Sequence, residues 1–176
     1  MSVKNFYPEK PVVPFSIVSV EMGKIIELLK ALNYPIEVKR SAYIIIRNET
    51  ANGRSVINGT NVGGVQSDSG KWAGDWGTAI VATCIKSENR TGNLRGFVVF
   101  DSLSSGIAFM CEKIQARGLY IGGFAKKIAS MVVSNKYDLA AAYYKEWVVG
   151  ETNYRPTPDE ATSFVSMYNQ AARIFE

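Results

Sequence analysis

The chain contains no histidine, and this absence narrows the chemistry that it could perform. It excludes the Ser-His-Asp and Cys-His catalytic arrangements and every zinc site that needs imidazole. The two cysteines, Cys84 and Cys111, lie far apart in apolar contexts, which is typical of buried thiols, and they are too few for a thiolate metal cage. If the chain is an enzyme without a bound cofactor, its acid–base work falls to carboxylates, with lysine and tyrosine as the other candidates.

Glu49 is the carboxylate whose position is most suggestive of acid–base chemistry. It ends a helix that the sequence predicts from Glu37 to Glu49. On a wheel of about 100° per residue it falls about 20° from Val38. The apolar stripe on that side also holds Ala42, Ile45 and Ile46. A carboxylate among apolar side chains keeps its proton to a higher pH, as the general acid of a glycosidase must. A glutamate that only caps the helix end is the alternative.

The segment after Glu49 has the composition of a loop that binds polar ligands. It runs from Asn58 to Asp68 as Asn-Gly-Thr-Asn-Val-Gly-Gly-Val-Gln-Ser-Asp. Its glycines allow close approach of the backbone, and its amides can pair with sugar hydroxyl and acetamido groups. Asn61 and Gln66 are therefore candidate sugar-binding residues, unless the glycines only make turns. Asp68 is the first candidate for a second catalytic carboxylate, ahead of Asp75 and Glu88.

Two aromatic residues outside this segment are further candidates for contact with a sugar. Trp72 flanks a polar loop, where its indole could stack on a sugar ring or pack in the core. Tyr120 lies in a predicted turn between helices, where it could line a cleft. Glu146, beside Trp147, is predicted to be a solvated position on a helix.

The order of the predicted elements indicates an α+β fold that is mostly helical. Helices are expected over residues 21–33, 37–49, 104–117, 124–133 and 137–149, and from Thr157 onward. Strands are expected over 78–86 and 96–100, within a glycine-rich region that we expect to form a small β wing beside the helices. The last helix has a capping-box start, Thr157-Pro158-Asp159-Glu160, and Gly118 is a predicted C-cap. Residues 1–176 are expected to form one domain, with residues 1–20 as an extended, proline-containing arm.

Three short blocks resemble those of the lysozyme-like superfamily, which includes lytic transglycosylases and phage-type muramidases. Glu49-Thr50 resembles the family's Glu-Ser pair at the end of a helix. Gly63-Gly64-Val65-Gln66 resembles its Gly-Leu-Met-Gln block, and Leu139-Ala140-Ala141-Ala142-Tyr143 resembles its Leu-Ala-Ala-Tyr motif. The blocks keep the family's order and span more than half of the chain. Tyr144 departs from the family, which has Asn there, and Val65 departs from its Met.

This resemblance implies a lysozyme-like fold and a peptidoglycan glycosidase without a cofactor. The enzyme would cut the glycan strand between N-acetylmuramic acid and N-acetylglucosamine, with Glu49 as the general acid and Tyr143 beside it. Hydrolysis and transglycosylation both stay open, because a transglycosylase uses the substrate's own hydroxyl and needs no second carboxylate. The alternative is a non-catalytic protein of the same fold that binds glycan or serves as a component of a virion or secretion machine.

The charge and hydropathy of the chain indicate which partners it can bind and where in the cell it is made. The net charge is +4, but the basic residues are scattered, with only the pairs Lys39-Arg40 and Lys126-Lys127, so no nucleic-acid partner is expected. No apolar run approaches the roughly 20 residues of a membrane-spanning helix, and no signal-peptide segment follows the first lysines. We expect a chain made in the cytoplasm that reaches the cell wall by lysis, in a virion or through a specialised secretion machine.

Overall fold

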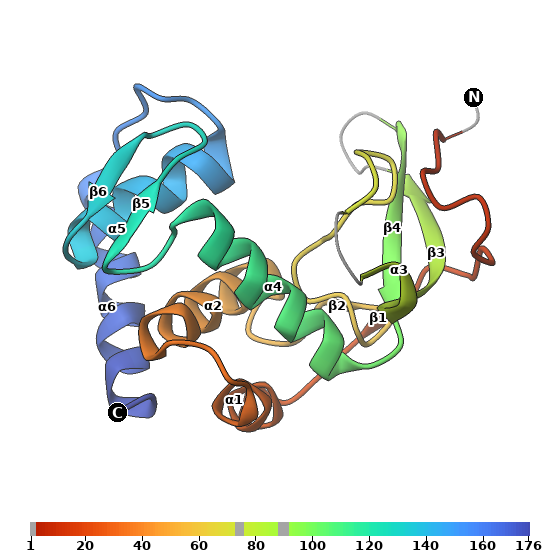
Figure 1. Ribbon diagram of the computed structural model, residues 1–176, viewed down its shortest axis with the longest axis horizontal. Coiled ribbons are helices and arrows are strands. Elements are labelled where there is room, and N and C mark those ends of the chain that lie inside the picture. The colour runs from red at the N-terminus through yellow and green to blue at the C-terminus, as the bar shows by residue number, and fades with distance from the viewer. Residues whose placement is uncertain (1–2, 73–75, 88–91) are drawn as a thin grey trace. The chain divides into compact units, whose positions relative to one another are not determined.

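The computed structural model describes residues 3–72, 76–87 and 92–176. Its helices are α1 (Met22–Ala31), α2 (Ile36–Glu49), α3 (Trp76–Ala79), α4 (Leu103–Arg117), α5 (Lys136–Tyr143), the π-helix η1 (Tyr144–Val149) and α6 (Pro158–Ile174). Three antiparallel strand pairs join β1 (Ile17–Val18) with β2 (Val56–Ile57), β3 (Ile80–Ser87) with β4 (Leu94–Phe100), and β5 (Gly123–Ala125) with β6 (Met131–Val133) (Figure 1). The predicted α+β class is confirmed, with its small antiparallel sheets.

The chain divides into two compact units. Unit 1 comprises Met1–Ile25 and Ile46–Phe109, and unit 2 comprises Ile26–Ile45 and Met110–Glu176. Helices α1, α2 and α4 each contribute residues to both units. The glycine-rich region belongs to unit 1, and the C-terminal helices belong to unit 2.

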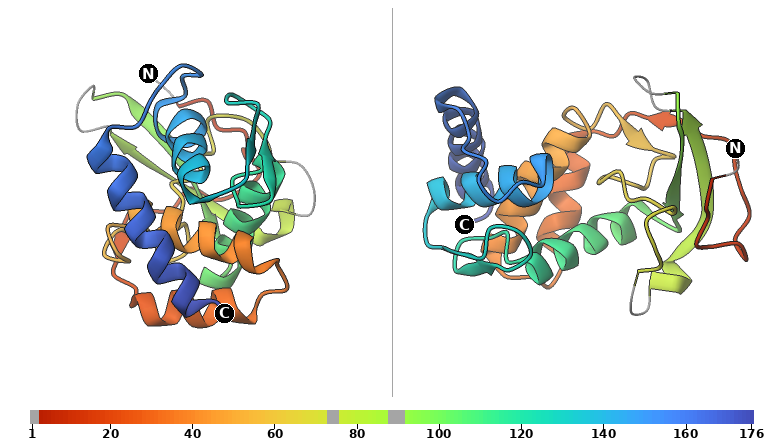
Figure 2. Two further views of the ribbon diagram at one scale, coloured as in Figure 1. Left: turned by 90° about the vertical axis from the view of Figure 1, so that its left-hand side faces the viewer. Right: turned by 90° about the horizontal axis from the view of Figure 1, so that it is seen from above.

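Unit 1 is built around the hairpin of β3 and β4. Its register pairs Ile80 with Phe100 and Ser87 with Leu94. The N-terminal arm runs beside β3, where Val13 N donates to Thr83 O at 2.8 Å and Thr83 N donates to Pro11 O at 2.9 Å (Figure 2). A proline is tolerated on such an edge because its carbonyl accepts while its missing N–H is not needed. The extended arm is therefore part of the wing.

The Gly-x-x-Gln block lies along the other edge of this hairpin. Val98 N donates to Val65 O at 3.0 Å, and Ser67 N donates to Gly96 O at 2.8 Å. A Cβ atom at Gly96 would lie 2.4 Å from the Ser67 hydroxyl oxygen, so a larger residue there would displace the Ser67 side chain. The segment from Val65 to Ser67 thus lies along β4, joined to it by an isolated antiparallel bridge between Gln66 and Phe97.

Unit 2 contains the β5–β6 hairpin where the sequence predicted a helix over residues 124–133, and that prediction is wrong. Its apolar residues alternate in burial with a period of two: Phe124 and Val132 are exposed, while Ala125 and Val133 are buried. Gly118 ends α4 as predicted, with a φ of 71°. A Cβ atom there would lie 2.1 Å from the carbonyl oxygen of Phe124, so glycine lets the chain return close to the helix end.

The start of α6 confirms the predicted capping box. Thr157 Oγ1 accepts from Glu160 N at 3.2 Å, and Thr157 N donates to Glu160 Oε2 at 2.8 Å. Further along α6, Tyr168 donates its hydroxyl hydrogen to Glu37 Oε2 at 2.7 Å. Burial, together with the Glu37 carboxylate, raises the pKa of Tyr168 to about 12. This bond fixes α6 against the first turn of α2 within unit 2.

The two cysteines are buried and unpaired, which confirms that they are core thiols. Burial raises the pKa of Cys84 to about 11 and the pKa of Cys111 to about 12. Thiols with such pKa values are almost entirely protonated at neutral pH and are poor nucleophiles. Among the described helices, none has the length and apolar character needed to cross a membrane.

Candidate functional site

Glu49 is the last residue of α2, and its side chain is exposed to solvent. The prediction that it lies in the buried stripe is therefore wrong. All six residues from 41 to 46 are buried, so the middle of the helix is covered on every side, but this burial stops after Ile46. A helical wheel gives the direction of a side chain around the axis, but it does not show how far along the axis the covering elements extend. The carboxylate is accessible to a ligand.

The turn after Glu49 fixes the end of α2. Thr50 is buried, and its hydroxyl donates to Ile46 O at 2.7 Å while accepting from Gly53 N at 2.8 Å. Ala51, Asn52 and Gly53 have φ values of 49°, 61° and 81°. A Cβ atom at Gly53 would lie 2.1 Å from the carbonyl oxygen of Val20, so this reversal requires glycine. The carboxylate thus projects from a helix end that its neighbours hold in place.

Asn61 is a structural residue, which corrects its prediction as a sugar-binding side chain. It is 1% exposed. Its amide nitrogen donates to Val65 O and to Val98 O, each at 2.9 Å, and its amide oxygen accepts from Val65 N at 2.9 Å. These bonds satisfy backbone groups that would otherwise be buried without partners. Asn61 therefore joins the Gly-x-x-Gln block to β4 from inside the unit.

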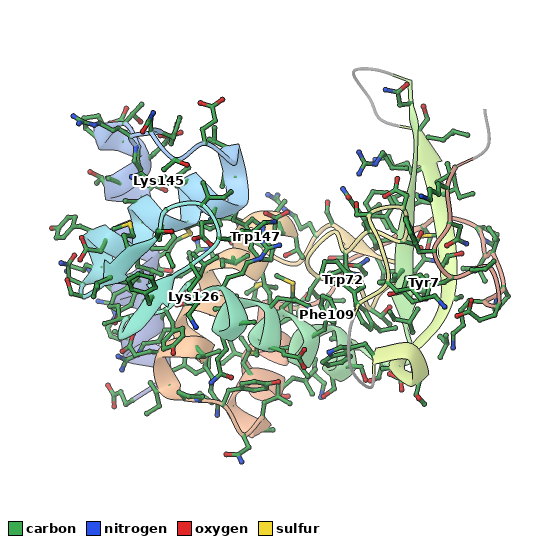
Figure 3. All side chains as sticks on the ribbon, turned by 45° about the horizontal axis from the view of Figure 1, so that its top comes forward. Tyr7, Trp72, Phe109, Lys126, Lys145 and Trp147 are labelled. Atoms are coloured by element: carbon green, nitrogen blue, oxygen red, sulfur yellow. The ribbon has the colours of Figure 1, made fainter. Side chains whose placement is uncertain are left out.

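Gln66 and Trp72 lie together at the surface of unit 1. Both are half-buried, and the indole Nε1 of Trp72 donates to Gln66 O at 3.3 Å. The side-chain oxygen of Gln66 accepts from the Ser69 hydroxyl. The Trp72 ring packs edge-on against Phe109, with 5.2 Å between ring centres (Figure 3). Phe109 also contacts Trp76 at 5.1 Å. This cluster supports the packing alternative for Trp72, and stacking on a sugar stays a prediction.

Asp68 forms an ion pair with Arg95. The Arg95 Nε atom lies 2.9 Å from Asp68 Oδ2, and Gly96 N donates to the same oxygen at 3.2 Å. The Asp68 side chain is 11% exposed. Its carboxylate therefore stabilises the loop against β4. The two weaker candidates for a second carboxylate, Asp75 and Glu88, lie outside the described residues.

Tyr143 and Tyr120 belong to unit 2. Tyr143 ends α5 and is buried, with its ring centre 5.2 Å from that of Tyr144 and 5.4 Å from that of Phe164. Tyr120 is half-buried in the turn that precedes β5, where its carbonyl accepts from Gly123 N at 2.9 Å. The structure gathers Asn61, Gln66, Asp68 and Trp72 along the β4 side of unit 1, and the two tyrosines lie on separate elements of unit 2.

Glu146 was predicted to be solvated, and this prediction is wrong, because the residue is 4% exposed. Its Oε1 atom accepts from the backbone N–H groups of Lys127, Ile128 and Ala129 at 3.1, 3.2 and 3.3 Å. The sequence did carry a signal for this burial. Glu146 follows Tyr143 by three residues and Leu139 by seven, so it continues the apolar face of α5 into η1.

No metal centre is evident in the part of the chain that the structure describes, because no three cysteine or carboxylate side chains gather there closely enough to hold an ion. Comparison with protein-family models, with curated proteins and with solved structures finds no match to the chain.

Proposed function

We propose that this chain is a peptidoglycan glycosidase that cuts the glycan strand between N-acetylmuramic acid and N-acetylglucosamine, with Glu49 as the general acid. The observation that carries the proposal is the exposed carboxylate at the fixed end of α2. It is followed in the same unit by the glycine- and amide-rich segment from Asn58 to Asp68. In a chain without histidine, such a carboxylate is the natural proton donor.

In this mechanism Glu49 gives its proton to the glycosidic oxygen as the bond to the anomeric carbon breaks, so that the leaving sugar departs as a neutral alcohol. Because Glu49 is exposed in the free protein, its protonated form must be favoured by the bound substrate. A saccharide that covers the carboxylate removes water from it and disfavours its charged form. The exposure of Glu49 is also what lets the glycosidic oxygen reach it.

Within this proposal, the environment of Asp68 favours transglycosylation over hydrolysis as the reaction. A carboxylate that activates water must be accessible to that water, but the Asp68 side chain is 11% exposed and is engaged by Arg95 and by Gly96 N. In a transglycosylase the substrate's own hydroxyl attacks the anomeric carbon. Glu49, having lost its proton to the leaving group, is then the base that accepts the proton of that hydroxyl. One carboxylate suffices for both steps.

The decisive experiment is incubation of the purified chain with purified peptidoglycan, followed by turbidity and mass spectrometry of the soluble products. We expect turbidity to fall and the products to carry anhydro-sugar ends. Reducing ends would show that water is the nucleophile and would overturn the transglycosylase mechanism. A folded chain that sediments with the walls but releases no fragments would overturn the glycosidase proposal in favour of a non-catalytic glycan-binding protein.

A further inference from the structure

Arg117 is a cation with unused hydrogen-bonding capacity. It ends α4 in unit 2 and is half-buried, and its guanidinium carbon lies 4.7 Å from the centre of the Trp147 ring. Burial lowers the pKa of Arg117, and the neighbouring Glu146 carboxylate raises it. A guanidinium has five N–H donors. Within residues 3–72, 76–87 and 92–176, none of the five donates a hydrogen bond.

Glu146 holds the loop between β5 and β6 in place without accepting a hydrogen bond from Arg117. Its Oε1 atom is engaged by three successive N–H groups of the loop between β5 and β6. That loop also carries two exposed cations, Lys126 and Lys127. Figure 3 labels Lys126 on this loop and Trp147 on η1. Glu146 Oε2 is buried and has no hydrogen-bond partner among the described residues, and its carboxylate attracts the guanidinium of Arg117. The exposed charges of the loop, Lys126 and Lys127, are both positive.

We propose that Arg117 binds a carboxylate of the peptide stem attached to muramic acid, with Lys126 and Lys127 adding positive charge. This inference rests on the proposed function, since it takes peptidoglycan as the ligand. A planar guanidinium matches a carboxylate with two parallel N–H···O bonds, which a lysine does not provide. The indole of Trp147 packs on one face of the guanidinium of Arg117. The N–H groups along the edge of the guanidinium can therefore bind a ligand with little further loss of side-chain conformational freedom.

Unit 2 contains a second cationic feature, which serves as an internal comparison. A cavity of about 410 Å³ is lined by Lys30, Lys39 and Arg173, but also by Glu176. One of its ammonium groups is already engaged, because Lys39 Nζ donates to Lys30 O at 3.0 Å. Its exposed cations also share the cavity with the exposed Glu176, whereas Glu146, the carboxylate beside Arg117, is buried. Arg117 is therefore the better anchor for an anion, and Arg173 is its matched control.

The test measures binding of two soluble probes by calorimetry, with all variants made in the Glu49→Gln background so that no probe is cut. One probe is a disaccharide–tetrapeptide muropeptide, and the other is the neutral chitotetraose. Arg117→Gln should weaken muropeptide binding about tenfold or more, because charge-assisted hydrogen bonds are lost, and should leave chitotetraose binding unchanged. Arg117→Lys should restore only part of the affinity. Arg173→Gln should bind both probes like the parent.

Unchanged muropeptide affinity in Arg117→Gln, or an equal loss for both probes, would overturn the inference. If Arg117→Gln fails to fold, Arg117→Lys decides, and full muropeptide affinity in that variant would overturn it. Arg117-dependent binding of polyribitol phosphate in place of the muropeptide would overturn the assignment to a carboxylate. A chain that binds the muropeptide through Arg117 but releases no wall fragments would refute only the glycosidase proposal. A chain that cleaves walls but whose muropeptide binding is indifferent to Arg117 would refute only this inference.

Discussion

The two units each place a glutamate near the end of a helix, and the two carboxylates have opposite environments. Glu49 in unit 1 is exposed where α2 ends, while Glu146 in unit 2 is buried in η1 and accepts three backbone hydrogen bonds. The sequence predicted the reverse for both residues, with Glu49 in a buried apolar stripe and Glu146 at a solvated position. What decides the environment is whether another segment covers the helix end. The loop from Lys127 to Ala129 covers Glu146.

This difference separates a carboxylate available to a ligand from one used for folding. An exposed carboxylate can meet a substrate but contributes little to the free energy of unfolding. A buried carboxylate that accepts backbone N–H groups stabilises the fold, and its loss leaves those donors without an acceptor. Substitution at the two positions should therefore affect different measurements.

The largest expected effect is on activity, at Glu49. Glu49→Gln keeps the volume and removes the transferable proton, so release of wall fragments should fall by about 10²–10⁴-fold or more. The melting temperature should stay close to that of the parent, since the side chain is exposed. Glu21→Gln, at another exposed glutamate of unit 1, is the matched control and should retain activity. Undiminished activity in folded Glu49→Gln would assign the chemistry to another residue.

The complementary effect is on stability, at Glu146. Glu146→Ala removes the acceptor of three N–H groups, and the free energy of unfolding should fall by on the order of 3 kcal/mol. Glu146→Gln keeps one oxygen as an acceptor and should lose less. Urea denaturation gives both values, with the exposed Glu151→Gln as control. Parental stability in Glu146→Ala would show that the loop does not depend on this carboxylate.

The same contrast shows which features the sequence could predict. The capping box at Thr157–Glu160 and the C-cap at Gly118 depend on neighbours in the chain, and both are confirmed. The helix predicted over residues 124–133 is wrong because each short strand of the hairpin has only three residues, too few to show alternation clearly. The burial of Asn61 depends on Val98, 37 residues away, which no local pattern encodes. The position of a site residue that is held by a distant part of the backbone, such as Asn61, therefore could not be predicted from the sequence.

A smaller effect is expected at Asp68, where the sequence predicted a catalytic base. Asp68→Asn weakens the ion pair with Arg95, so the free energy of unfolding should fall by about 1–2 kcal/mol. Wall cleavage should persist within several-fold, and the products should keep their anhydro-sugar ends. A loss of activity of about 100-fold or more in a folded variant would restore Asp68 as a catalytic carboxylate. Asp75→Asn and Glu88→Gln, measured in parallel, test the other two candidates.

The smallest effects are expected at the adjacent tyrosines of unit 2, and they test the resemblance of Leu139–Tyr143 to a lysozyme-like motif. Tyr143 is buried against Phe164, whereas Tyr144 is half-buried. Burial and the Glu160 carboxylate raise the pKa of Tyr144, so its phenol stays neutral at physiological pH. If the Tyr143 hydroxyl contributes to catalysis, as the resemblance implies, Tyr143→Phe should lower turnover several-fold while costing about 0.5–1.5 kcal/mol of stability.

Tyr144→Phe is the matched control, because it removes the same hydroxyl from the next residue and leaves the ring contacts within the unit. It should change stability by less than about 0.5 kcal/mol and leave turnover unchanged. Turnover of wall fragments and urea denaturation of both variants separate the two roles. A Tyr143→Phe variant that loses stability but keeps full turnover would make Tyr143 a core residue only. If Tyr144→Phe is the damaging change, the motif is in the wrong register, because adjacent residues of a helix point about 100° apart.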